Sequence, residues 1–240
     1  MKLTKHAFQF SGIWGTGVWG ANVYLLIDDN LTLVDTGFKG RCGQILKEVR
    51  RLGYSPSDIS NIIITHHHAD HIGSLAVLKE ITRAKVLAHA ADAPYIDGRL
   101  PQPTPGWLKW LSKALPTSSQ LWSTNPVPVD MLVNDGDELP ILGGITILHT
   151  PGHTQGSISL FLQEKRLLIA GDVLANRFRL GLPSKEFTMD MAQEINSIKR
   201  IASLDFDVIG FGHGSPIRHE AHSKIEKLVE TLESKHQRIR

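Results

Sequence analysis

Four side chains that can bind metal ions lie close together in the segment THHHADH, residues 65–71. They are His66, His68, Asp70 and His71. The segment follows an uninterrupted β-branched run, residues 61–65, that predicts a buried strand. Side chains alternate along a strand, so His66 and His68 should share one side while His67 points away, which excludes it as a ligand. Asp70 and His71 come after the chain bends and can bind a metal at a second position nearby. Imidazole and carboxylate groups together suit Zn²⁺, and also Fe or Mn.

Three more potential ligands each follow a later predicted strand. His153 lies in the turn TPGHT, Asp172 ends an apolar run, and His213 lies in the segment FGHG. Loops at strand ends are where α/β folds hold their chemistry, so we expect these residues to join the first four. The other histidines stand in no comparable context and are expected to be structural or surface residues. Among these, His89 is expected to lie nearest the site.

Regular elements that can position these residues are visible in the apolar spacing. Helical spacing predicts helices over residues 43–52, 74–83 and 191–202, and a last helix around residues 221–232. Apolar and β-branched runs predict strands over residues 8–10, 18–27, 31–34, 61–65, 85–88, 145–148, 157–162, 166–170 and 207–211. Strands alternate with helices in both halves, so the class is α/β or α+β.

One stretch departs from this pattern. Residues 93–128 hold seven of the 12 prolines, together with Trp107, Trp110 and Trp122. We interpret it as an irregular insertion around one short helix, residues 107–115, because exposed indole surface is costly in a linker. The whole chain, residues 1–240, is expected to form a single domain of a size that one core can support.

Composition excludes several classes of protein. The 26 basic and 24 acidic residues leave a net charge of +2, which gives no general reason to bind nucleic acid or an anionic membrane. The single Cys42 excludes an internal disulfide framework and a cysteine-based zinc cluster. No signal-peptide pattern or transmembrane run is visible. We therefore expect a soluble cytoplasmic protein that acts on a small molecule; a homodimer stays open.

The order of the potential ligands resembles the metallo-β-lactamase superfamily. The similarity also includes the segment LVDTG at residues 33–37, the TPGHT turn and the Gly171–Asp172 pair, and it extends over nearly the whole chain. It implies an α+β fold, a four-layer αββα sandwich in which two mixed β-sheets are flanked by helices. The metals would lie at one edge of the sheets.

Carried over by position, the resemblance implies two metal ions. One would take His66, His68 and His153. The other would take Asp70, His71 and His213. Asp172 would bridge the two ions, and Asp35 matches a family residue that orients a ligand imidazole by hydrogen bonding. A plain turn aspartate is the alternative for Asp35.

This resemblance implies a metal-dependent hydrolase with two divalent ions, foremost Zn²⁺. Two ions about 3.5–4 Å apart can hold a bridging hydroxide that attacks an ester, lactone or thioester of a small molecule. Asp70 and Asp172 are the expected catalytic residues, Asp70 passing a proton to the leaving group.

Three related activities are weighed against this one. A mononuclear iron persulfide dioxygenase would use the equivalents of His66, His153 and Asp172, and the sequence leaves it open. A glyoxalase II-like thioesterase shares the THxHxDH run, but its family adds a C-terminal helical region where this chain has one helix after His213. Quorum-quenching lactonases of the superfamily share the ligand set but place Tyr where Ala175 stands, which disfavours lactonase activity of that type.

Two segments are candidates for substrate recognition. The tryptophans at residues 13–19 and in the insertion would favour an apolar acyl group if they cover the metals; packing against the sheets or a second subunit is the alternative. Arg177 and Arg179 follow Asp172 and can hold an anionic tail. A solvated charged loop is the alternative for these two arginines.

Overall fold

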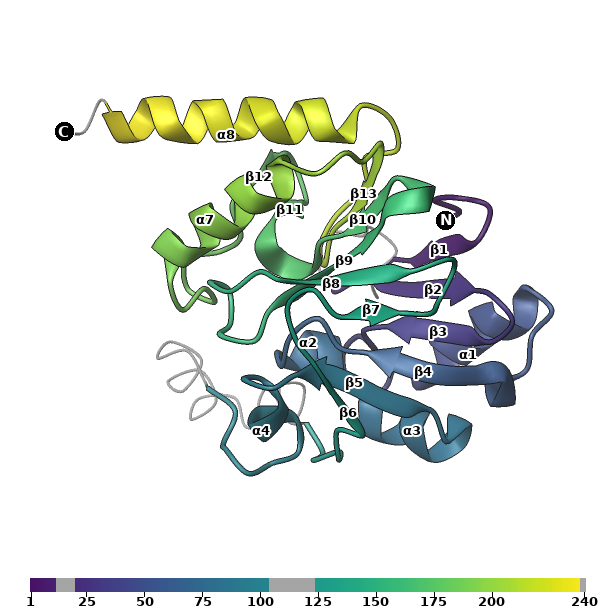
Figure 1. The fold of residues 1–240 in the computed structure, drawn as a ribbon. Coiled ribbons are helices and arrows are strands. Elements are labelled where there is room, and N and C mark those ends of the chain that lie inside the picture. Colours follow the sequence, from purple (N-terminus) through teal and green to yellow (C-terminus); the bar gives the residue numbers. More distant parts are fainter. Residues whose placement is uncertain (12–19, 104–123, 238–240) are drawn as a thin grey trace.

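Two mixed β-sheets form the centre of the structure (Figure 1). The computed structural model describes residues 1–11, 20–103 and 124–237. Within them, the first sheet consists, in spatial order, of β1 (Ala7–Phe10), β2 (Val23–Ile27), β3 (Leu31–Val34), β4 (Ile59–Ile63), β5 (Lys85–His89) and β6 (Met131–Val133). The second consists of β13 (Val208–Gly210), β10 (Leu167–Ile169), β9 (Ile158–Leu162), β8 (Ile145–His149) and β7 (Glu138–Leu139).

Strand direction brings the chemistry-bearing loops to common edges. Strands β3 to β6 run parallel, so the loops that follow β3, β4 and β5 emerge at one edge of the first sheet. In the second sheet β10 runs parallel to β13, and β8 and β10 are both antiparallel to β9. The carboxyl ends of β8, β10 and β13 therefore also lie at one edge.

Helices cover the outer face of each sheet (Figure 1). Helices α1 (Cys42–Arg51) and α3 (Leu75–Thr82) bury an apolar stripe against the first sheet. Helices α7 (Met191–Ala202) and α8 (Ala221–Gln237) do the same against the second sheet. A third apolar cluster fills the space between the two sheets. Each face of each sheet is thus buried, and the predicted four-layer αββα sandwich is confirmed.

Shorter elements complete the connections. They are the helices α2 (Ala69–Ile72) and α4 (Ala93–Ile96), the 3₁₀ turns η1 (Pro56–Asp58), η2 (Gln163–Lys165) and η3 (Gly171–Val173), and the hairpin strands β11 (Ala175–Asn176) and β12 (Leu180–Gly181). In the described residues, no helix is both long enough and apolar enough to cross a lipid bilayer.

The sequence predictions agree with most of these elements. Helix α7 has the predicted bounds, and α1 and α3 differ from theirs by one residue at each end. The strand predicted over residues 61–65 runs from Ile59 to Ile63, because the chain leaves the sheet before Thr65 to form the ligand loop. Strands of two or three residues, such as β6 and β7, are too short to produce a recognisable period. The helix predicted at residues 107–115 and all five tryptophans lie outside the described residues.

Candidate metal centre

The seven potential ligands converge from four separate loops, each of which follows a strand. His66 to His71 follow β4, His153 follows β8, Asp172 lies in η3 after β10, and His213 follows β13. Their ligand atoms fall into overlapping groups whose members lie within 4.8 Å of one another. The structure thus brings together every residue that the sequence nominated.

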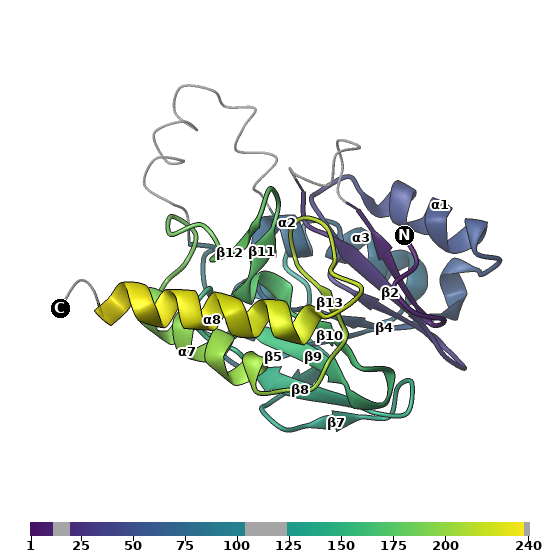
Figure 2. The same ribbon diagram turned by 90° about the horizontal axis from the view of Figure 1, so that it is seen from above.

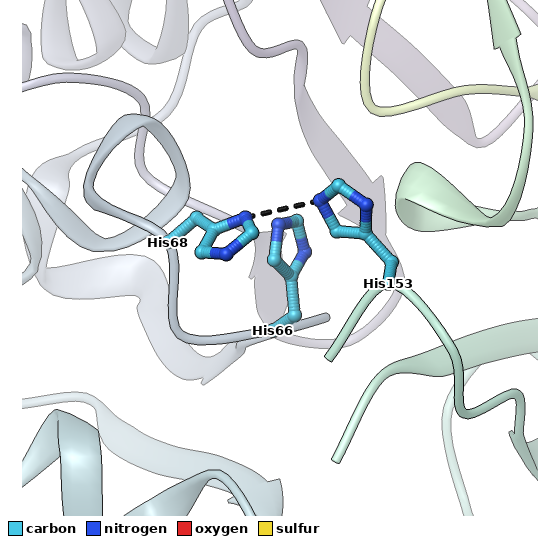
Figure 3. A group of neighbouring side chains, drawn as sticks. All are labelled: His66, His68 and His153. Atoms are coloured by element: carbon cyan, nitrogen blue, oxygen red, sulfur yellow. Dashed lines mark hydrogen bonds between the residues drawn. The ribbon is translucent and has the colours of Figure 1, made fainter. Parts of the chain in front are cut away.

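The first group consists of His66, His68 and His153. The Nε2 atom of His153 lies 3.0 Å from Nδ1 of His68, and the ring of His66 lies 4.8 Å from both other rings, centroid to centroid. Figure 3 shows the three imidazoles pointing toward one another from two chain segments. His66 and His153 are buried, while His68 is half-buried. His68 is therefore the most exposed member of this group.

The second group consists of Asp70, His71 and His213. One carboxylate oxygen of Asp70 lies 3.1 Å from Nε2 of His213 and 3.9 Å from Nε2 of His71. Asp70 and His71 come from the turn after His68, and His213 comes from the loop after β13. This geometry agrees with the expectation that Asp70 and His71 contribute to a second ligand group.

Asp172 lies between the two groups. Its Oδ2 atom is 3.4 Å from Nε2 of His153 and 3.2 Å from Nε2 of His213, and its Oδ1 atom is 3.5 Å from Nε2 of His71. The carboxylate therefore faces one histidine of the first group and two of the second. This is the position that a bridging ligand needs.

Hydrogen bonds on the far side of four rings fix their orientation. The Thr65 hydroxyl donates to Asp35 and therefore accepts from Nδ1 of His66, at 3.1 Å. The Thr188 hydroxyl donates to the Ser184 carbonyl and therefore accepts from Nδ1 of His153, at 3.2 Å.

The same tautomer follows for the two remaining rings. Nδ1 of His71 donates to Oδ2 of Asp35 at 2.8 Å, and Nδ1 of His213 donates to the Gly20 carbonyl at 3.1 Å. All four rings thus hold a proton on Nδ1 and turn Nε2 to the centre, where a metal would displace any proton that Nε2 carries; this is how proteins prepare histidine for a metal.

Asp35 supports both groups at once. Its carboxylate accepts hydrogen bonds from the Thr65 amide, the Thr65 hydroxyl and His71. The backbone of Asp35 is left-handed, with φ of 62°, and the side chain is 1% exposed. Asp is one of the few residues besides Gly that adopt this conformation readily. The orienting role expected for Asp35 agrees with these contacts.

Unpaired polar atoms at the centre show that metal ions fit here. Nε2 of His66, Nε2 of His71 and Oδ1 of Asp172 are all buried, and none has a hydrogen-bond partner among the described residues. Buried polar atoms without a partner are costly, and metal coordination satisfies them. The donors are nitrogen and oxygen only, a set that suits Zn²⁺, Fe or Mn.

Charges at the centre are strongly coupled. Burial disfavours an ionised Asp172, yet His213 and His71 hold the pKa of its carboxyl below the usual range. Burial also opposes a charged His213, but Asp172 and Asp70 raise its pKa to about 10. For His153 burial prevails and lowers the pKa to about 4. Asp172 is thus ionised beside a protonated His213, and a divalent cation that binds here would displace the proton.

Two polar residues that sequence reasoning missed help to form the centre. Asp92, 1% exposed, accepts hydrogen bonds from the His67 amide, the Thr154 hydroxyl and the Gly156 amide, and so ties the two loops of the first group together. Glu194 is fully buried beneath Gly152, and burial raises its pKa to about 9. No sequence motif marks either residue, because both act through contacts distant along the chain.

Other histidines lie outside the groups. His67 turns away as predicted, with Nδ1 2.9 Å from Gln102 and its ring stacked on Tyr95. His89 stacks on His149, at 4.1 Å between ring centroids, and belongs to none of the ligand groups.

Known proteins share both the sequence pattern and the fold. The model of the metallo-β-lactamase superfamily matches residues 16–213, and the chain belongs to that superfamily. A probable metallo-hydrolase of Bacillus subtilis, YflN, is 31% identical over 228 residues, which cover 86% of this chain and 85% of that protein. The chain is thus an enzyme of the metallo-hydrolase class.

More distant similarities are partial in sequence or confined to the fold. Hydroxyacylglutathione hydrolase of Pseudomonas aeruginosa is 32% identical over 148 residues, covering 61% of this chain but 43% of that protein. The solved metallo-β-lactamase family protein TTHA1429 of Thermus thermophilus has a TM-score of 0.76 at 24% identity, covering 98% of this chain and 81% of that one. BJP-1, a subclass B3 metallo-β-lactamase of Bradyrhizobium japonicum, has a TM-score of 0.69 at 22% identity, covering 99% of this chain and 93% of that one.

Proposed function

We propose that this enzyme hydrolyses an ester, lactone or thioester of a small molecule with two divalent metal ions, preferably Zn²⁺. The observation that supports this most directly is the position of Asp172 between two complete ligand groups. A relative named hydroxyacylglutathione hydrolase adds support for an acyl substrate.

The ligand assignment follows from the two groups. His66, His68 and His153 would hold one ion, Asp70, His71 and His213 the other, and Asp172 would contact both. Bound divalent ions polarise a carbonyl oxygen and make water acidic enough to act as a nucleophile near neutral pH.

Asp70 and Asp172 have different roles in this scheme. The Asp70 side chain is 14% exposed against 7% for Asp172, so a leaving group can approach Asp70 more easily from solvent. Asp70 accepts the proton of the attacking water and passes it to the leaving oxygen or sulfur. Asp172 stays ionised and keeps His71, His153 and His213 turned to the centre.

The alternative is a dioxygenase with a single iron, held by His66, His153 and Asp172. A site of that kind leaves Asp70, His71 and His213 without a ligand role, although all three contribute to a compact group. A glyoxalase II-like thioesterase is a narrower form of the main proposal. Among the described residues, α8 is the helix that follows His213.

Metal analysis and a substrate panel test the proposal together. We expect about two zinc ions per chain in freshly purified protein and turnover of at least one ester, lactone or thioester. Asp172→Ala should lose metal and turnover. Asp205→Ala should keep both, because it removes an exposed carboxylate that pairs with Arg166 at the other end of β10 from Asp172. One iron per chain with oxygen consumption, or full activity of metal-free Asp172→Ala, would contradict it.

The type of substrate, the cellular location and the oligomeric state are also part of the proposal. The near-balanced charge supports a small-molecule substrate rather than nucleic acid or a membrane. The one cysteine, Cys42, is buried at the start of α1, which is compatible with the cytoplasm. A homodimer, the single-domain organisation and the insertion at residues 93–128 stay predictions.

A further inference from the structure

A short hairpin projects from the segment that connects Asp172 with α7 (Figure 2). Its strands are β11 and β12, which pair through Ala175 with Gly181 and Asn176 with Leu180. The tip consists of Arg177, Phe178 and Arg179, all of them exposed, and Phe178 is 85% exposed. It is the most exposed large apolar side chain among the described residues.

The base of this hairpin is fixed to the candidate metal centre. The Asn176 amide donates to the carbonyl of His213 at 3.0 Å, and the Asn176 carbonyl accepts from the Ser215 amide at 3.0 Å. The Asn176 side-chain amide donates to the Ser215 carbonyl at 2.8 Å. The contact is so close that a Cβ on Gly214 would lie 2.0 Å from the Asn176 carbonyl oxygen. The tip begins one residue beyond Asn176, so at most about 7 Å of chain separates Phe178 from this anchor.

The two arginines at the tip present their guanidinium groups on the surface. Neither Arg177 nor Arg179 forms a hydrogen bond or ion pair with any described residue. A guanidinium presents its donors in a planar fork that matches a carboxylate or phosphate. Two such groups beside an exposed aromatic ring, on a rigid support next to His213, are suited to an anionic molecule with an apolar part.

The same connecting segment borders the first ligand group with apolar side chains. The ring of Phe187 lies 6.4 Å from that of His68, centroid to centroid, and Thr188 contacts His153. The Met189 amide donates to the His153 carbonyl, and its side chain is 51% exposed. One segment thus places apolar surface beside the metal centre and cationic groups farther out.

We propose that the tip of the β11–β12 hairpin recognises an anionic group of the substrate. The substrate is then an ester or thioester that also carries a carboxylate or phosphate group. This inference rests on the proposed hydrolase function and narrows its substrate class.

Matched probes test the inference with the zinc-loaded enzyme. Butanoyl thioesters of 6-mercaptohexanoate and 6-mercaptohexyl phosphate are compared with the neutral thioester of 6-mercaptohexanamide. We expect kcat/KM to be about tenfold higher for at least one anionic probe at low salt, and the preference to shrink in 0.5 M NaCl because salt screens exposed charges. The anionic probe with the larger increase in kcat/KM shows whether the hairpin prefers a carboxylate or a phosphate.

The variants are the pair Arg177→Gln with Arg179→Gln, and the control Arg50→Gln, which removes an exposed charge from α1. The double variant should lose the preference through KM and keep kcat on the neutral probe, whereas the control should keep both. If the wild type shows no preference for the anionic probes, or the double variant retains that preference, the hairpin inference is wrong. Hydrolysis of the neutral probe would still support the proposed hydrolase function. Absence of turnover on every probe overturns both.

A second measurement needs no turnover. Phenylglyoxal modifies accessible arginines, and mass spectrometry measures the modification of each one. The product 6-mercaptohexanoate, or its phosphate analogue, should protect Arg177 and Arg179 at least threefold and leave Arg50 unprotected. If the product changed the modification of none of the three arginines, the result would count against the inference.

Discussion

Replacing Asp35 by Asn should weaken metal binding at both ligand groups. Asn tolerates the left-handed backbone of residue 35 and has nearly the same shape, so the change acts on hydrogen bonding and on the charge beside His71. Asp35 accepts three hydrogen bonds, but an Asn side chain has one acceptor oxygen and an NH₂ group that would face another donor.

The misplaced NH₂ group should disturb two metal ligands, His66 and His71. With the NH₂ group on the side of the Thr65 hydroxyl, that hydroxyl turns to accept and offers its proton to Nδ1 of His66. His66 then carries its own proton on Nε2, where the metal-binding lone pair had been. His71 loses its acceptor in the same way. Loss of one such supporting partner lowers metal affinity about 10- to 100-fold, or roughly 1.4–2.7 kcal/mol.

Zinc titration against a chromophoric chelator measures this loss, and long-range ¹H–¹⁵N spectra of the histidines report the tautomers. Asp92→Asn is the matched control, because Asp92 is equally buried and also accepts three hydrogen bonds, yet contacts no ligand ring. The control should lose folding stability with a smaller change in metal affinity. If Asp35→Asn bound zinc within twofold of the wild type with unchanged tautomers, the reasoning would be refuted.

Two further predictions concern stability. Gly214→Ala should lower the melting temperature by several degrees, since φ is +93° and the new Cβ would overlap Asn176; Gly181→Ala, whose Cβ meets open space, should not, and equal melting temperatures would contradict the close contact. Glu194→Gln should stabilise the protein in chelator at pH 8 relative to wild type, with the gain vanishing near pH 4. The reason is that folded Glu194, with its pKa raised to about 9, retains a proton that the unfolded chain releases above about pH 4.5, so wild-type stability falls as pH rises through that window. Denaturant melts at both pH values check the sign.

The amino-acid sequence alone determined which residues could bind metal and the order in which they occur. Local spacing was sufficient for this, because His66 to His71 lie in one loop and each later ligand follows a short apolar run. Local spacing also predicted α1, α3 and α7, whose apolar stripes repeat with the helical period. The resemblance to a known superfamily supplied the layer order, which periodicity cannot give.

Only the tertiary structure decided how these residues meet and what supports them. His68 and His153 are 85 residues apart along the chain, and Asp92 joins loops that lie 25 and 62 residues away from it. Such contacts depend on which strands are neighbours and which edges their ends share, and no local pattern encodes that. The Asp35–Thr65–His66 chain of hydrogen bonds, and the hairpin clamped to His213 through Asn176, exist because two sheets pack face to face and bring their loop-bearing edges together.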